Sequence, residues 1–387
     1  MIYLFNPWHD LALANFTTSY TPPASAVKMS NDLALLPAWY GGDDAVIAEG
    51  ETNRSFLDTV KHQLPITAEI ISIQEIASCR GKKIIPWGWN PMLRRKMVVL
   101  GADELQLPSI EELELLKAYA NRKNAVRLLQ ELKEEEENFC GESHYFSRLE
   151  ELLEFLQSIP GDKILKMPVS GSGKGLIWIL GNITDKQTDW CRRVIREQGG
   201  VVAEPVLRKV QDFAMEFYLQ KGTVQFSCYS LFRSAASGTY AGNELLSDER
   251  IEEKLSGYIS MVTLRQLRDS LSAKLSQYFP KYSGYAGVDM MVCETDEGYR
   301  IQPCVEINMR MNMGVVARIF HDRYMNHSAE GKFVVDFFKK PGSAKLFHEK
   351  MQREWPLEVV QEKIISGYLP LTPVTSDTCY MAYVQIC

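Results

Sequence analysis

The sequence predicts an α/β (α+β) protein with a small N-terminal α/β lobe, and three observations support this class. Four short apolar runs alternate with helical patterns in the first hundred residues, at positions 2–5, 45–48, 69–73 and 82–86. Later strands are joined by tight turns, which indicates a second body built around antiparallel sheet. The length of 387 residues is sufficient for two or three lobes, each with its own core.

Composition and charge limit the classes of partner. Hydrophobic residues make up 45% of the chain and charged residues 24%, which is typical of a globular protein in water. The net charge of −6, without a basic stripe, argues against nucleic acid as a partner. No apolar run approaches 18 residues, so we expect no membrane span. The first residues lack a basic region and a long apolar core, so we also expect no secretory signal. Eight scattered cysteines indicate free thiols and a cytoplasmic location.

Helix and turn signals divide the middle of the chain. Ser109 is a helix N-cap, with Glu112 completing a capping box, and helical patterns continue through residues 146–157 to the breaker Pro160-Gly161. Two strands then form a hairpin around Lys221-Gly222, at positions 210–220 and 223–232. In the last sixty residues, only positions 333–338 and 380–386 resemble strands or packing segments.

A hairpin in the last third of the chain carries three oxygen ligands on one face. Strands 285–293 and 299–310 alternate so that Asp289, Glu306 and Asn308 point away from the apolar side. A two-residue turn at 296–297 would place residue 289 opposite residue 304, with Glu306 and Asn308 following on the same face. Such an all-oxygen set favours Mg²⁺ or Mn²⁺ and, with Mg²⁺, a phosphate ligand. The alternative is a surface hairpin with ordinary solvated acids.

A glycine-rich segment supplies a second signal for phosphate. The predicted strand 163–169 carries Lys166, the loop 170–175 reads Ser-Gly-Ser-Gly-Lys-Gly, and strand 176–180 returns. Glycines allow backbone N–H groups to approach phosphate oxygens, and the lysines add positive charge. The alternative is a hairpin tip that binds nothing. Strand 201–207 follows, and it carries Glu204.

The order of these signals resembles the ATP-grasp superfamily, typified by D-alanine:D-alanine ligases and biotin carboxylase. The resemblance spans about residues 1–325, with specific motifs from residue 163 onward, and implies a small N-terminal lobe followed by two α+β lobes that clasp ATP. The implied domains are a pre-ATP-grasp-like lobe (1–108), the helical part of the first grasp lobe (109–162), the ATP-grasp core (163–325) and a C-terminal extension of unknown role (326–387).

The resemblance also assigns roles to individual residues. Arg310 resembles the arginine that stabilises the transferring phosphate, and Asp289, Glu306 and Asn308 resemble the metal triad. Arg233 is a candidate for a substrate carboxylate, and an ordinary surface arginine is the alternative. The ATP-binding set is Lys123, Lys166, Ser170, Gly171, Ser172, Gly173, Glu204, Val206, Leu207 and Asp212, with Arg122 competing with Lys123. One departure is Met309, where members commonly have proline.

The resemblance implies an ATP-dependent carboxylate–amine ligase. ATP with Mg²⁺, or Mn²⁺ in its place, would activate a carboxylate as an acylphosphate, which an amine then attacks. We expect an amino acid or small peptide as substrate, no nucleic-acid or membrane partner, and leave the oligomeric state open. The alternatives are an ATP-grasp small-molecule kinase and a non-catalytic nucleotide-binding protein.

Overall fold

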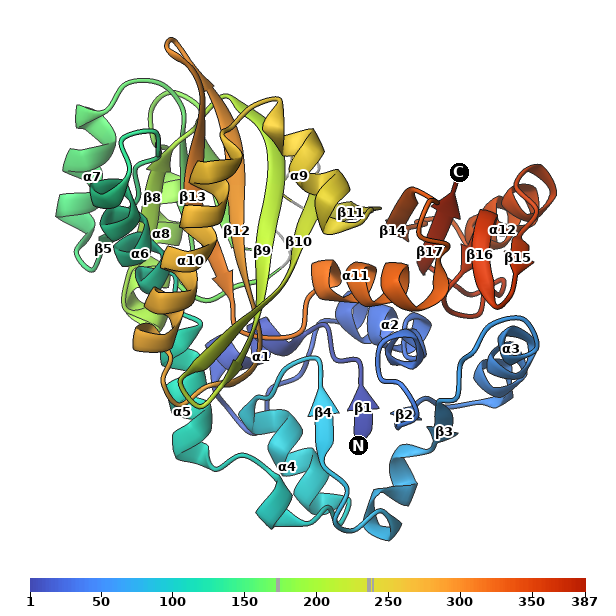
Figure 1. Ribbon diagram of the computed structural model, residues 1–387. Coiled ribbons are helices and arrows are strands. Elements are labelled where there is room, and N and C mark those ends of the chain that lie inside the picture. Colours follow the sequence, from blue (N-terminus) through green and yellow to red (C-terminus); the bar gives the residue numbers. More distant parts are fainter. Residues whose placement is uncertain (172–174, 235–237, 239) are drawn as a thin grey trace. The chain divides into compact units, whose positions relative to one another are not determined.

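The computed structural model describes residues 1–171, 175–234, 238 and 240–387 (Figure 1). The predicted ATP-binding residues Ser172 and Gly173 therefore lie outside the described residues. The chain forms two compact units. The first unit contains Met1–Glu114, Ala241–Asp248 and Met311–Cys387, and the second contains Leu115–Tyr240 and Glu249–Arg310.

A parallel sheet forms the N-terminal part of the first unit, as the sequence predicts. Its strands follow the order β3-β2-β1-β4 and all pair in parallel. Ile2, Ile47 and Ile84 are buried in one core with Leu93 and Met97, which explains why these strands read as short apolar runs. The strands are β1 (Ile2–Leu4), β2 (Ala45–Ile47), β3 (Glu69–Ile71) and β4 (Ile84–Pro86).

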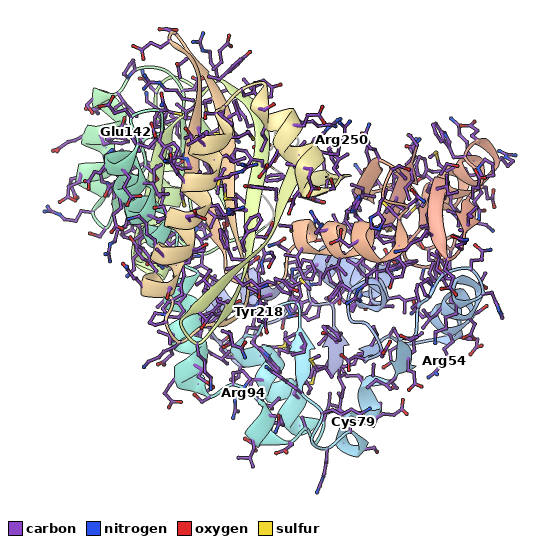
Figure 2. The ribbon with its side chains drawn as sticks, viewed as in Figure 1. Arg54, Cys79, Arg94, Glu142, Tyr218 and Arg250 are labelled. Atoms are coloured by element: carbon purple, nitrogen blue, oxygen red, sulfur yellow. The ribbon has the colours of Figure 1, made fainter. Side chains whose placement is uncertain are left out.

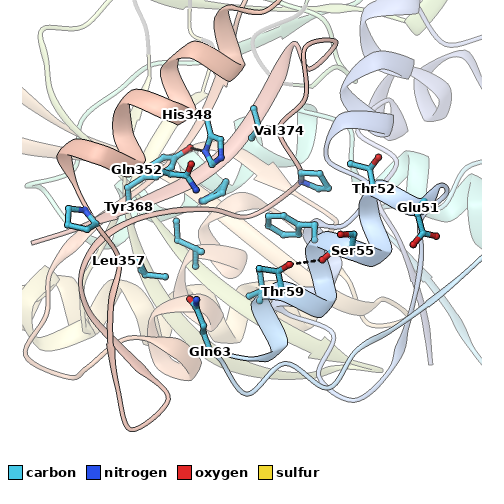
Figure 3. A pocket seen from close by; sticks show the side chains of 16 residues that line it. Glu51, Thr52, Ser55, Thr59, Gln63, His348, Gln352, Leu357, Tyr368 and Val374 are labelled. Carbon is cyan, nitrogen blue, oxygen red and sulfur yellow. Dashed lines mark hydrogen bonds between the residues drawn. The ribbon is translucent and has the colours of Figure 1, made fainter.

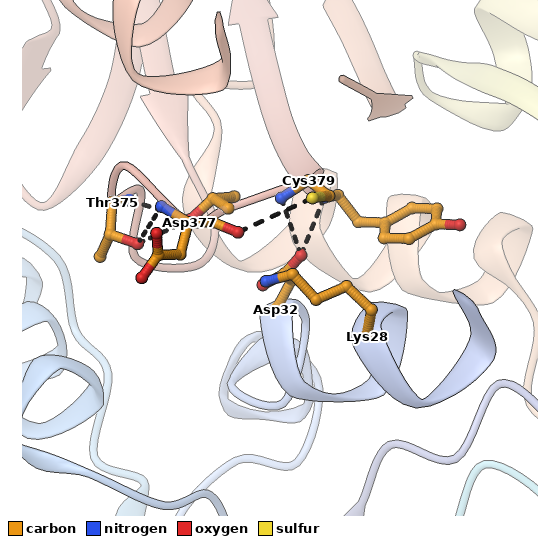
Figure 4. Close-up of polar contacts among 7 residues, drawn as sticks. Lys28, Asp32, Thr375, Asp377 and Cys379 are labelled. Carbon is orange, nitrogen blue, oxygen red and sulfur yellow. Dashed lines mark hydrogen bonds and ion pairs between the residues drawn. The ribbon is translucent and has the colours of Figure 1, made fainter. Parts of the chain in front are cut away.

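The C-terminal residues belong to the same unit. Asp32 at the end of α2 accepts hydrogen bonds from the backbone N–H groups of Cys379 and Tyr380, at 2.9 and 3.0 Å (Figure 4). Trp39 Nε1 donates to the Leu371 carbonyl at 2.6 Å. Antiparallel strands run in the order β11-β14-β17-β16-β15. They are β11 (Tyr240–Leu245), β14 (Gly331–Phe337), β15 (Glu358–Val360), β16 (Lys363–Pro370) and β17 (Tyr380–Ile386).

Helices complete the first unit and link it along the chain to the second. The predicted capping box is present, because Ser109 N–H donates to Glu112 and Glu112 N–H donates to Ser109 Oγ. The α-helices are α1 (His9–Asn15), α2 (Ala24–Asp32), α3 (Glu51–Lys61), α4 (Pro91–Val99), α11 (Met313–Tyr324) and α12 (Ser343–Glu354), with α5 (Ile110–Tyr119) and α9 (Asp248–Ser256) crossing between units. Short 3₁₀ helices are η1 (Leu36–Trp39), η2 (Ile73–Ser78) and η3 (Glu104–Gln106).

A small antiparallel sheet forms the first lobe of the second unit, in the order β5-β8-β6-β7. One prediction is wrong here: the helix expected from Phe146 begins at Leu149, because residues 144–146 pair with β8 as a strand. The elements are β5 (His144–Phe146), α7 (Leu149–Ser158), β6 (Lys163–Lys166), β7 (Leu176–Ile179), α8 (Asp185–Gln198) and β8 (Val201–Pro205).

A larger antiparallel sheet forms the second lobe, in the order β13-β12-β9-β10. Helix α6 packs against β13 and α10 packs against β10. The predicted turns are confirmed, since Gln220 pairs with Thr223 and Thr295 with Gly298. The elements are α6 (Lys123–Glu135), β9 (Lys209–Gln220), β10 (Thr223–Ser234), α10 (Met261–Tyr278), β12 (Ser283–Thr295) and β13 (Gly298–Asn308).

The register of the β12–β13 hairpin differs from the prediction. Residue 289 lies opposite Glu306, not residue 304, because the ladder shifts between Met291↔Gln302 and Asp289↔Glu306. Pro303 lies inside this bulge, and a proline cannot donate to a ladder, so it occurs at bulges and on edge strands. The bulge makes the two carboxylates direct neighbours, with Cβ atoms about 5 Å apart, where a regular ladder would leave them diagonal at about 7–8 Å.

No helix among the described residues has both the length and the apolar character needed to span a membrane.

Candidate active site

Asp289 and Glu306 form the centre of a polar site on the larger sheet. They are paired across β12 and β13, and Asn308 Nδ2 donates to Asp289 Oδ2 at 3.0 Å. Removal from water raises the pKa of the Asp289 carboxyl well above its usual value, and the neighbouring Glu306 and Glu216 raise it further against the opposing effects of Asn308 and Arg310. The ionised form is therefore unfavourable at this position unless a cation is close.

Arg122, at the start of α6, joins Glu306 to the glycine-rich loop. Its Nη2 donates to Glu306 Oε1 at 2.6 Å, and its Nη1 donates to the Met167 carbonyl at 2.6 Å and to Ser170 Oγ at 2.7 Å. Its Nε is buried and has no hydrogen-bond partner. Lys123, the next residue, is exposed on the first turn of α6. Of the two competing residues, the structure brings Arg122 to the site.

Lys166 and Glu204 form a buried ion pair in the small lobe. Lys166 Nζ lies 2.7 Å from Glu204 Oε2, and each side chain is 7% exposed. Ser143 Oγ donates to Glu204 Oε1 at 2.9 Å. These two residues of the predicted ATP-binding set, on β6 and β8, are therefore in direct contact. Ser143 was not predicted, and no sequence signal distinguishes it, because β5 is too short to show a period.

Cys304 shows that these two charged groups converge. Its buried thiol has a raised pKa, caused first by removal from water and then by Asp289 and Glu204, while Lys166 opposes the shift. The pKa of this one side chain of β13 is thus raised by carboxylates from both lobes of the second unit. The sequence places Cys304 on the ligand face but gives no reason to assign it a role.

The loop between β6 and β7 requires glycine at its end. Gly175 has φ +81°, and a Cβ there would lie 2.8 Å from Ser170 Cβ. Its carbonyl accepts from Met167 N–H at 2.9 Å, which closes the hairpin. Ser170 and Gly171 are buried beside it. The start of the loop, at Met167 and Ser170, is held close to the Arg122 side chain.

The remaining predicted residues have different surroundings. Val206 is 40% exposed, and its N–H donates to the Asp162 carbonyl at 2.9 Å. Leu207 is half-buried, with its carbonyl accepting from Lys209 N–H. Asp212 forms an ion pair of 2.6 Å with Lys209. These contacts place the hinge segment beside β9, at the edge of the site.

The two predicted arginines differ in position. The charge of Arg310 lowers the pKa of both Asp289 and Tyr282 against larger opposing effects, so Arg310 lies close enough to act on these two groups. Arg233 is exposed near the end of β10. Tyr218, labelled on the larger sheet in Figure 2, contacts Tyr285 edge to face with ring centroids 5.1 Å apart. This aromatic pair was not predicted as part of the site.

The donor set of the site suits a hard cation. Across the described ranges, no three His, Cys, Asp or Glu side chains gather into a metal centre. The predicted triad has only two carboxylates, and its third member is an amide. Ions such as Mg²⁺ accept this composition because they keep water and phosphate oxygens as further ligands.

The first unit has a cavity of different chemistry, with a volume of about 730 Å³ (Figure 3). Helix α3 contributes Ser55 and Thr59 to one wall, and the C-terminal segment contributes His348 and Tyr368, whose side chains are hydrogen-bonded at 3.0 Å. Lys and Arg do not occur among the described residues that line it. This lining does not suit a triphosphate.

Comparison with known proteins identifies the fold. No protein-family model matches the chain, and no curated protein sequence matches it. Biotin carboxylase from Campylobacter jejuni, in a complex with β-γ-ATP, superposes with a TM-score of 0.51 at 11% identity, covering 100% of this chain and 87% of that chain. The chain has an ATP-grasp fold.

Two other ATP-grasp structures are similar to the chain. The N5-carboxyaminoimidazole ribonucleotide synthetase from Thermus thermophilus has a TM-score of 0.49 and 11% identity, covering 100% of this chain and 93% of that chain. An L-amino acid ligase from Bacillus licheniformis has a TM-score of 0.44 and 11% identity, covering 88% and 93%. Within this ATP-grasp fold, Lys166 and Glu204 belong to the small lobe, and Asp289 and Glu306 to the large one.

Proposed function

We propose that the protein is an ATP-dependent ligase that activates a carboxylate as an acylphosphate for attack by an amine, with an amino acid or small peptide as substrate. The observation that carries the proposal is that the Arg122 side chain contacts Glu306, the partner of Asp289, and also the carbonyl of Met167, the residue after Lys166 of the Lys166–Glu204 pair. All eight cysteines are free, which supports the proposal of a cytoplasmic enzyme.

ATP and Mg²⁺ fit the residues present. The two carboxylates and the amide oxygen of Asn308 are ligands that Mg²⁺ accepts, with Mn²⁺ as the alternative. The buried Nε of Arg122 lacks an acceptor, and a phosphate oxygen would supply one. When bound, the nucleotide and metal supply the phosphoryl group and neutralise its charge.

The chain's own residues orient and stabilise the reactants in this mechanism. Lys166 and Arg122 hold phosphate oxygens, and the loop that begins at Ser170 covers them and excludes water. The hinge after Glu204 faces the adenine. Arg310 stabilises the negative charge that develops as the carboxylate attacks. Arg233 is proposed as a contact to the substrate carboxylate.

Turnover with pooled acceptors tests the proposal. The purified protein is incubated with ATP, Mg²⁺ and amino acids, and ADP release and new amide masses are measured. We expect Asp289→Ala and Glu306→Ala to lower turnover at least about 100-fold, since each removes charge stabilisation of the transferring group. Asp296→Ala is the control, because Asp296 is 98% exposed in the turn of the same hairpin.

Other products would identify the alternatives. A phosphate ester in place of an amide would show a kinase. Nucleotide binding without ADP release, for any pair of carboxylate and amine, would contradict the ligase proposal and favour a non-catalytic nucleotide-binding protein.

A further inference from the structure

We propose that Arg122 is a positioning residue that couples the binding of metal to the binding of nucleotide, by holding the Glu306 carboxylate until a phosphate group takes over the guanidinium. The inference rests on the proposed function, because it concerns the same nucleotide and metal. It adds that the binding of nucleotide releases Glu306 for the metal, and it assigns this release to the Arg122 side chain.

The contact between Arg122 and Glu306 competes with a metal ion. Nη2 donates to Glu306 Oε1 at 2.6 Å, and the two side chains are 7% and 26% exposed. A buried charge pair of this kind is difficult to break without a replacement for one partner, since the charge left behind is poorly solvated. A cation that binds Glu306 alone must therefore displace an internal cation that already neutralises it.

The guanidinium has N–H donors left for an anion. Its two Nη atoms contact Glu306, Ser170 and Met167, whereas Nε is buried without a partner. An arginine fork binds phosphate oxygens strongly because its donors match their geometry. A phosphate near the loop would accept a hydrogen bond from an unused donor, and its negative charge would attract the guanidinium away from Glu306.

The main chain keeps Arg122 in place during this exchange. Its backbone N–H donates to the Pro168 carbonyl at 2.8 Å, which fixes the residue to the strand that leads into the glycine-rich loop. Only the side chain has to turn between the loop and β13. The exchange therefore requires no rearrangement of either lobe.

A shared ion pair makes the two binding events reciprocal. If nucleotide frees Glu306 for metal, then metal on Glu306 must free Arg122 for nucleotide to the same extent. Coupling of this kind typically amounts to about 5–150-fold in affinity. Without the arginine, each ligand would bind independently of this pair.

The experiment measures Mn²⁺ binding by electron paramagnetic resonance and calorimetry, with and without a non-hydrolysable ATP analogue. In the wild type we expect the analogue to tighten Mn²⁺ binding within the range given above. In Arg122→Gln, Mn²⁺ alone should bind more tightly than to the wild type and the analogue alone should bind more weakly. The coupling should fall below the wild-type value, to the part that phosphate oxygens supply as direct metal ligands. A structural role alone would not strengthen metal binding.

Two further variants keep the test decisive. Arg127→Gln removes another Arg–Glu pair of α6, Arg127–Glu131, and should leave the coupling as in the wild type. Arg122→Lys keeps the buried charge and should retain part of the coupling, which gives a measurement if Arg122→Gln does not fold.

The outcomes separate the inference from the proposed function. A wild-type protein that binds neither the analogue nor ATP would overturn the proposed function. A wild-type protein that turns over ATP but binds Mn²⁺ equally well with and without the analogue would overturn only the role of Arg122. The same conclusion would follow if folded Arg122→Gln bound Mn²⁺ alone no better than the wild type.

Discussion

The candidate active site and the cavity of the first unit use polar groups in opposite ways. The site buries charges in pairs, Lys166 with Glu204 and Arg122 with Glu306, and every partner comes from a different strand or helix. The cavity is lined by apolar side chains and prolines together with hydroxyl, amide and imidazole groups, and its acid, Glu51, is exposed. Burial of charge is costly, so the paired charges indicate chemistry more strongly than the volume of the cavity does.

The largest expected effect comes from breaking the ion pair in the small lobe. Lys166→Met leaves the Glu204 carboxylate buried without its cation and should lower the free energy of unfolding by about 3–5 kcal/mol. Adding Glu204→Gln to the same chain should recover part of this loss, while ATP binding stays impaired. Urea denaturation of the two single variants and the double variant measures the coupling.

The control for these charge-removing substitutions is Glu51→Gln in the wall of the cavity. Because Glu51 is exposed, we expect the free energy of unfolding to change by no more than about 0.5 kcal/mol.

Strictly additive losses in the Lys166 and Glu204 variants would show that the two charges do not depend on each other.

An effect of intermediate size is expected when one glycine of each region is replaced by alanine. Gly175 and Gly50 both have positive φ, +81° and +87°, but a Cβ meets Ser170 at 2.8 Å in the first and nothing within 4 Å in the second. Both alanine variants should lose about 1–3 kcal/mol from backbone strain. Only Gly175→Ala should also weaken ATP binding, because the loop must shift.

Thermal unfolding and calorimetry with ATP measure the two quantities separately for each glycine variant. Equal ATP affinities for Gly175→Ala and Gly50→Ala would show that the geometry of the loop does not matter for the nucleotide.

The smallest effect is expected within the cavity. Tyr368→Phe removes the hydroxyl that is hydrogen-bonded to His348 and should cost about 0.5–1.5 kcal/mol. ATP binding and turnover should be unchanged, as measured by calorimetry and ADP release. A large loss of turnover in this variant would give the cavity a part in the reaction and contradict the contrast drawn between the two regions.

Local signals made several parts of the fold predictable. The apolar runs of β1 to β4, the capping box at Ser109 and the turn at 296–297 all depend on residues close in sequence, and each was confirmed. The lysine of β6 and the acid of β8 were also assigned to the ATP site, because the order of motifs resembles that of the ATP-grasp superfamily. Their contact with each other was not predicted, since it depends on how β6 pairs with β8.

The remaining features depend on contacts distant in sequence. Arg122 and Lys123 are adjacent, and only the packing of α6 decides which one faces β13. Ser143 reaches Glu204 from a position next to a strand of three residues. The proline itself was a local signal for the bulge at Pro303. The prediction did not use it, because the two-residue turn favoured a regular ladder. Helix α12 and strand β16 were missed because their apolar pattern is broken by polar residues.

The bulge in the β12–β13 hairpin also affects how the chain folds. A hairpin closes from its turn, and the turn at 296–297 dictates the pairing only as far as Met291 and Gln302. Beyond Pro303 the pairing follows a different register, in which Asp289 lies opposite Glu306 on β13 and opposite Ala214 on β9. The turn alone therefore does not fix the pairing of the two carboxylates, which depends on the bulge at Pro303.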